Sequence, residues 1–272
     1  MVLSPVVCGN DKRVDTLVFA RVSLPLTYDA ESQHPMSWFQ LDPQSIAERA
    51  KAGGSTSCMP SLAASVWRGI LGFTCVSIAG FAPWALAGRW FHRTVGEAGL
   101  YTVCALVFIG LSGPLLHRLI IGPGSLARFY KLFSVAFAAY SVAWIIGWMS
   151  LRGHTGSLVG LFVGTAVMGW MFARAFDAPG AALKAIAALF VLNGLGYFIG
   201  GWIEGSVAGL KDLFGVALQK SARMTLAKLL WGICYGIGFG AGLGLAFHYC
   251  QASARACCRE LPPRQDSRPG DW

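Results

Sequence analysis

Six long apolar stretches, separated by short polar or Gly/Pro-rich breaks, dominate the chain after residue 60. They cover residues 62–87, 98–121, 129–149, 157–176, 181–203 and 226–250. A helix needs about 20 mostly apolar residues to cross the hydrocarbon core of a bilayer, and each stretch reaches that length. The pattern therefore predicts an all-α integral membrane protein with six transmembrane helices.

The first 60 residues have a different character. They carry five Lys/Arg and six Asp/Glu, and their last part is small, polar and glycine-containing, as linkers are. We expect a largely disordered cytoplasmic extension over 1–60 with a short helix near 43–52, a six-helix transmembrane domain over 61–250, and a cytoplasmic tail over 251–272. An alternative is that the natural chain starts at Met36 or Met59. On either interpretation, deletion of residues 1–58 should leave membrane insertion and thermal stability unchanged.

Composition and charge agree with a membrane location. Hydrophobic residues make up 55% of the chain and charged residues only 13%, about half of the charged share of soluble domains. The formal net charge is +9, but the basic residues are scattered over short loops instead of forming one soluble face, which argues against a nucleic-acid partner. The expected partners are the lipid bilayer and, in an assembly, other membrane subunits or a second copy of the chain.

Lys and Arg near the helix ends predict the orientation, because cytoplasmic loops carry the excess of basic residues. An even number of spans puts both termini on one side of the membrane. That side has twelve basic residues, namely Arg49, Lys51, Arg68, Arg118, Arg128, Lys131, Arg174, Lys184, Arg255, Arg259, Arg264 and Arg268, and the other has seven, namely Arg89, Arg93, Arg152, Lys211, Lys220, Arg223 and Lys228. The asymmetry predicts a multi-pass protein of the cell (inner) membrane with both termini cytoplasmic.

Glycines at regular spacing mark the last three stretches. In 226–250, four glycines lie four residues apart and share one helix face: Gly232, Gly236, Gly240 and Gly244. Such a face has no side chains, so another helix backbone can approach it closely. Glycines also recur in 157–176 and 181–203. The pattern predicts glycine-rich packing among the last three spans.

Asn193 is the candidate ligand-binding residue, because it is a strong hydrogen-bonding group near the middle of a span. Glycines follow it, and transporters build solute sites where helices unwind locally. The alternative is a hydrogen bond between helices, with close packing around it. The acidic residues between 61 and 250 lie in loops or at helix ends, which argues against a carboxylate proton relay.

His117 and His248 lie near the same end of their respective spans. Two neutral imidazoles at matching depth can ligate one haem b, so these residues are the candidate metal ligands of a redox hypothesis. The alternative is that both are interfacial residues that contact headgroups. The sequence predicts no other cofactor.

Two further features lie toward the expected outer side. Six tryptophans fall near that interface, where indole rings commonly anchor helices: Trp84, Trp90, Trp144, Trp148, Trp202 and Trp231. The segment 205–223 has apolar residues at helical spacing, which predicts an amphipathic helix lying on the headgroups.

Enzyme motifs such as G-x-S-x-G, H-E-x-x-H and a P-loop lysine are absent from the sequence, so catalysis is not the expected role. The first hypothesis is a structural or accessory component of the membrane. The second is a small-solute transporter or channel with a site between the last three spans, and the third is a membrane-bound haem b protein. A mid-membrane cavity lined by Asn193 would favour transport, and a packed interior there would favour the structural role.

Overall fold

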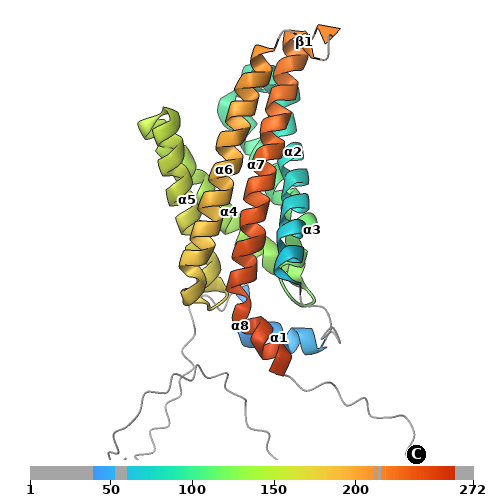
Figure 1. The fold of residues 1–272 in the computed structure, drawn as a ribbon, viewed down its shortest axis with the longest axis vertical. Coiled ribbons are helices and arrows are strands. Elements are labelled where there is room, and N and C mark those ends of the chain that lie inside the picture. The colour runs from blue at the N-terminus through green and yellow to red at the C-terminus, as the bar shows by residue number, and fades with distance from the viewer. Residues whose placement is uncertain (1–38, 53–59, 211, 214–215, 218, 261–272) are drawn as a thin grey trace, which may run out of the picture. The chain divides into compact units, whose positions relative to one another are not determined.

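A computed structural model describes residues 39–52, 60–210, 212–213, 216–217 and 219–260. Six helices are long and apolar enough to cross a membrane, and they form the bundle in Figure 1. They are α2 (Leu62–Thr94), α3 (Gly96–Leu116), α4 (Ser125–Leu151), α5 (Gly153–Ala175), α6 (Ala182–Gly209) and α7 (Lys220–Cys250). The all-α membrane fold with six spans is confirmed. The disorder expected at 1–38 and 53–59 lies outside the described residues.

At the end of the bundle where α6 connects to α7, several helices are longer than the hydrophobic pattern indicates. Helix α2 continues to Thr94, and the chain turns only at Val95 and Gly96, where glycine adopts a φ of +71°. The amphipathic interfacial helix expected over 205–223 is wrong. Instead α6 runs to Gly209, a short antiparallel pair follows, formed by β1 (Asp212–Leu213) and β2 (Val216–Ala217), and α7 begins at Lys220. The expected segment is therefore divided among the end of α6, the β1–β2 hairpin and the start of α7.

Short elements complete the other end of the bundle. They are α1 (Pro43–Ala52), α8 (Ala252–Glu260) and the two 3₁₀ turns η2 (His117–Leu119) and η3 (Pro179–Ala181). Figure 1 shows α1 and α8 side by side at the end opposite the hairpin. Asp42 caps α1 by accepting a 2.9 Å hydrogen bond from the Ser45 backbone N–H, an interaction that stabilises helix starts. The short helix expected near 43–52 is confirmed.

Helix α1 and the residues just before it pack into the core next to the spans. Phe39, Leu41 and Ile46 are buried to 4%, 1% and 0% exposure and belong to the main hydrophobic cluster. Ala47 and Ala50 pack against Cys258 of α8. The part of the chain before the first span therefore contributes to the packing of the bundle.

We now expect deletion of residues 1–58 to lower thermal stability, in contrast to the expectation from composition. The sharper variant is Ile46→Ala, which should cost about 2 kcal/mol or more, because it leaves a cavity at a fully buried site. Unfolding followed by circular dichroism in detergent measures it. Glu48→Ala on the exposed face of α1 is the matched control and should change little. Equal melting temperatures for both variants would contradict the packing role of α1.

The glycine face of α7 contacts α2, the first span. A Cβ added at Gly240 would overlap the carbonyl oxygen of Gly69, and one at Gly244 would lie 2.5 Å from the carbonyl oxygen of Ser65. Ser77 strengthens the same interface by donating a 2.6 Å hydrogen bond to the carbonyl oxygen of Gly232. Bare glycine surfaces thus bring the two backbones together, as the spacing predicts. The spacing alone did not identify α2 as the partner helix.

Glycines also join the other neighbouring spans. On a second face of α7, a Cβ at Gly238 would lie 2.8 Å from the Cα of Gly196 in α6. A Cβ at Gly160 of α5 would lie 2.7 Å from the carbonyl oxygen of Trp144 in α4. The close packing predicted for the last three spans therefore exists between α6 and α7 and, at Gly169 against Ile186, between α5 and α6, while Gly156, Gly160 and Gly164 of α5 face α4.

Candidate functional site

A cavity of about 620 Å³ lies toward the hairpin end of the bundle, and all six spans line it. We call it the vestibule. Nine of its lining side chains are aromatic: Phe81, Trp84, Tyr101, Trp144, Trp148, Tyr197, Phe198, Trp202 and Trp231. Leu100, Cys104, Gly153, His154, Ser157, Gly201 and Glu204 complete the lining. A concave, mostly apolar space with a few polar groups is the usual form of a small-molecule site.

The aromatic walls pack on one another, which holds their rings in place. The rings of Phe81 and Trp231 meet edge to face with centroids 4.7 Å apart, and Tyr197 meets Trp231 at 5.5 Å. Trp144 stacks on Trp148 at 6.2 Å. Such geometries suit the quadrupoles of aromatic rings, so the vestibule presents several fixed π faces and edges.

A lysine beside the vestibule already uses one of these π faces. The Nζ of Lys228 lies 4.2 Å from the centroid of the Trp84 ring and donates a 3.3 Å hydrogen bond to the Trp84 carbonyl oxygen. Ammonium groups are attracted to the face of tryptophan more than to the other aromatic rings. This contact shows that an indole ring of the wall attracts a positive charge, and Lys228 already occupies that face of Trp84.

Four polar side chains in the lining could orient a ligand. Glu204, half-buried near the end of α6, is the one carboxylate among the lining residues. The hydroxyls of Ser157 and Tyr197 share a 3.1 Å hydrogen bond between α5 and α6. The indole Nε1 of Trp144 is buried and has no hydrogen-bond partner in the described part of the protein. A buried donor without a partner is rare and is available to a bound molecule.

Asn193 lies deeper in the bundle, outside the vestibule lining. Its side chain is fully buried, and its Nδ2 donates a 2.9 Å hydrogen bond to the hydroxyl of Tyr140. That hydroxyl lies 3.3 Å from the hydroxyl of Tyr235, whose ring stacks on Trp231 of the vestibule wall. The network joins α6, α4 and α7, which is the interhelical hydrogen bonding that was one of the two interpretations of Asn193. Its Oδ1 has no partner among the described residues.

A layer of buried aromatic rings closes the bundle below the vestibule. Phe73 is its centre, with ring centroids at 4.6 Å from Phe239, 5.9 Å from Phe108 and 6.5 Å from Phe137. The side chain of Phe73 has no exposed surface. On each of α2, α3, α4 and α7 this layer lies on the α8 side of the vestibule residues. The vestibule is therefore separated from the α8 end by packed side chains.

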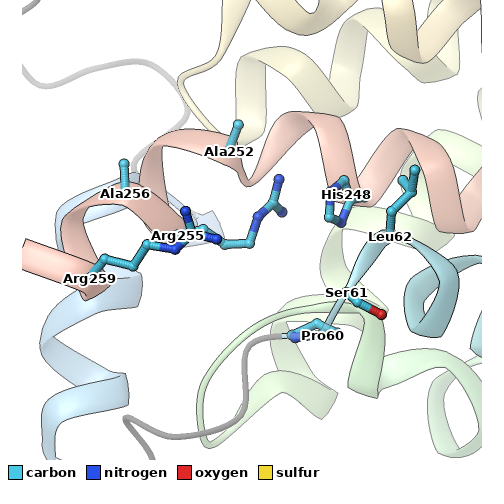
Figure 2. A pocket seen from close by; sticks show the side chains of 8 residues that line it. All are labelled: Pro60, Ser61, Leu62, His248, Ala252, Arg255, Ala256 and Arg259. Atoms are coloured by element: carbon cyan, nitrogen blue, oxygen red, sulfur yellow. The ribbon is translucent and has the colours of Figure 1, made fainter.

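The two histidines of the haem hypothesis have different surroundings. The Nδ1 of His117 lies 3.0 Å from the carbonyl oxygen of Gly113 and 3.2 Å from that of Pro114, so this nitrogen is the donor. His248 lines a pocket of about 510 Å³ with Arg255 and Arg259, and His117 is not part of that lining (Figure 2). Within the described ranges there is no group of three or more His, Cys, Asp or Glu residues suited to a metal ion.

The sequence pattern did not indicate that the tryptophans of the expected outer side surround a cavity. Of the six tryptophans expected to anchor helices at the interface, five line the cavity and Trp90 does not. The sequence did place tryptophans of four different spans, and Glu204, at a similar depth in the membrane. Rings of that kind converge when the helices surround a space.

Comparison with protein-family models, with curated proteins and with solved structures finds no match for this chain. Its activity is therefore inferred from the geometry of the vestibule and the helices around it.

Proposed function

We propose that this multi-pass membrane protein is a carrier or channel that binds a small organic cation in the vestibule. The supporting observation is a cavity lined by all six spans, with aromatic walls and one carboxylate. Cation–π attraction contributes about 0.5–2 kcal/mol per contact, depending on desolvation, and aromatic cages are used to bind quaternary ammonium groups. Glu204, which also interacts electrostatically with Lys228, supplies the carboxylate.

The proposed solute site is thus the vestibule, whereas the transport hypothesis from the sequence placed it at Asn193. The packed network around Asn193 leaves that level of the bundle closed, and a carrier needs a closed barrier on one side of its binding site at any moment. Alternating access then requires that the layer around Phe73 opens when the vestibule closes.

Tryptophan fluorescence and a thermal-shift assay on purified protein test the binding step. Choline and its uncharged isostere 3,3-dimethyl-1-butanol are the probes, because they differ in the positive charge and little in shape. We expect choline alone to quench fluorescence and raise the melting temperature, and Glu204→Gln to weaken its binding about tenfold. Asp212→Asn, an exposed carboxylate in the hairpin, is the matched control. Equal responses to both probes, or equal loss in both variants, would contradict a cation site.

A structural or accessory component of the membrane is the second candidate function, and the sealed middle of the bundle favours it. Uptake of radiolabelled choline into proteoliposomes separates the two. Binding with uptake supports the carrier, whereas a protein with neither binding nor uptake fits the structural role. The haem b hypothesis on His117 and His248 stays a prediction that the absorption spectrum of the native protein tests.

We further propose that both termini, and with them α1 and α8, face the cytoplasm of a cell whose inner membrane holds the bundle. The basic residues near the helix ends support this orientation. Single cysteines placed beside Arg128 and Arg152 should be labelled by a membrane-impermeant thiol reagent from opposite sides, the first from the cytoplasm and the second from outside. The reverse pattern would overturn the orientation.

A further inference from the structure

A second pocket lies at the end of the bundle opposite the vestibule, where α7 passes into α8. Figure 2 shows His248 beside Ser61 and Leu62 at the start of α2, with Arg255 and Arg259 following along α8. Pro60, Ala252 and Ala256 complete its lining. We call it the basic pocket.

Positive charge in the basic pocket is not balanced by its lining. Arg255 and Arg259 are four residues apart on α8 and therefore share one face of the helix. None of the eight lining residues is acidic. Burial lowers the pKa of the half-buried Arg255, and the positive charge of Arg259 lowers it further. Like charges four residues apart destabilise a helix slightly, and an anion beside both side chains relieves this repulsion.

Two other groups in the pocket could donate hydrogen bonds to an anion. The Nδ1 of His248 is buried and has no hydrogen-bond partner in the described ranges. The first turn of α2, a helix of 33 residues, has backbone N–H groups without carbonyl partners in the helix, and the helix dipole favours negative charge there. Ser61 caps one of them by accepting a 3.1 Å hydrogen bond from the Ala64 N–H.

The surface beside the pocket is apolar and faces outward. Leu62 lines the pocket and is 44% exposed, and Val66, four residues further along the same face of α2, is partly exposed. Apolar side chains exposed along a membrane span contact acyl chains. A molecule with an anionic head in the pocket could therefore extend its hydrocarbon part along α2.

We propose that the basic pocket binds the phosphate of an anionic lipid headgroup. The guanidinium groups of Arg255 and Arg259 donate charge-assisted hydrogen bonds to the phosphate oxygens, and His248 and the start of α2 supply further donors. The bound lipid fixes α8 against the start of α2 and so ties the C-terminal helix to the first span. This site is separate from the vestibule and does not depend on the function proposed there.

Native mass spectrometry of the full-length protein in detergent tests the site. The probes are dioleoyl phosphatidylglycerol and dioleoyl phosphatidylcholine, which share acyl chains and differ in net charge. We expect one phosphatidylglycerol to be retained at a concentration about tenfold lower than phosphatidylcholine, and the double variant Arg255→Gln/Arg259→Gln to lose this preference. Arg118→Gln, an exposed arginine at the same end, should keep it. Equal loss in Arg118→Gln, or no loss in the double variant, would overturn the proposal.

A second pair of variants guards against a folding defect in the arginine variant. Ala256→Glu places an acid in the pocket, whereas Ser253→Glu places the same acid on exposed surface of α8 outside the lining. Only the first should weaken phosphatidylglycerol binding, at an unchanged helical circular dichroism spectrum. Glycerol 1-phosphate identifies the source of the phosphate. Failure of millimolar glycerol 1-phosphate to displace the lipid supports a lipid site, and displacement at micromolar concentration shows a site for free phosphate esters and overturns the lipid assignment.

Discussion

Gly240→Leu should separate α2 from α7 and produce one of the largest losses of stability available in this protein. Even a Cβ at this position would overlap the carbonyl oxygen of Gly69, so the obstacle is backbone, which cannot rotate away as a side chain can. Overpacking costs typically about 1–3 kcal/mol of stability and sometimes more. We expect a cost at the upper end of this range, because the added side chain would press on a neighbouring backbone. Unfolding in a denaturing detergent, followed by circular dichroism, measures the loss.

Gly110→Leu is the matched control for Gly240→Leu. Gly110 is exposed in the middle of α3, and nothing lies within 4 Å of a Cβ built there. Leucine is the better helix former by roughly 1 kcal/mol, so the control should be neutral or slightly stabilising. If Gly240→Leu behaves like the control, the α2–α7 contact does not determine the stability of the bundle.

The number of spans could be predicted from the sequence because each span is a separate apolar stretch of sufficient length. The ends of the spans were harder to predict. Helix α2 continues through Arg89, His92 and Arg93 to Thr94, although a hydrophobicity pattern stops before these residues. Long basic side chains can reach the headgroups from a helix end. The apolar stretch therefore stops at the first charged residue, although the helix continues beyond it.

The partner of the α7 glycine face could have been found from a second pattern. On α2, Ser65, Gly69 and Ser77 are spaced by multiples of four residues. Because the helices are antiparallel, Ser65 meets Gly244, Gly69 meets Gly240, and Ser77 meets Gly236 and Gly232. One glycine stripe shows that a bare face exists, and only a complementary stripe on another span indicates which helix covers it.

The vestibule could not be predicted from periodicity. Its lining comes from six helices, and its existence depends on how each helix is tilted and rotated, whereas the sequence of a span such as α6 is apolar on every side. Asn193 stood out because it is polar, but a buried amide with a tyrosine partner stabilises a helix contact. Tryptophans at helix ends suggested anchoring because that is their commonest role in membranes.

Phe73→Ala should be the most damaging substitution of a side chain in the bundle. Phe73 has no exposed surface and contacts five aromatic rings, those of Phe108, Phe133, Phe137, Tyr235 and Phe239. Truncating a buried phenylalanine costs about 3–5 kcal/mol, because the cavity that it leaves closes only in part. Leu71→Ala, at a residue that is 63% exposed on the same helix, should cost much less in the same unfolding assay.

The same variant tests whether the aromatic layer is the barrier below the vestibule. Removal of the central ring opens space between the vestibule and the α8 end, so proteoliposomes with Phe73→Ala should release trapped choline faster than those with the wild-type protein. Phe73→Leu fills most of the volume and should restore both stability and retention. If Phe73→Ala lowers stability but leaves the rate of release unchanged, this layer is only a structural core, and the barrier of a carrier must lie elsewhere in the bundle.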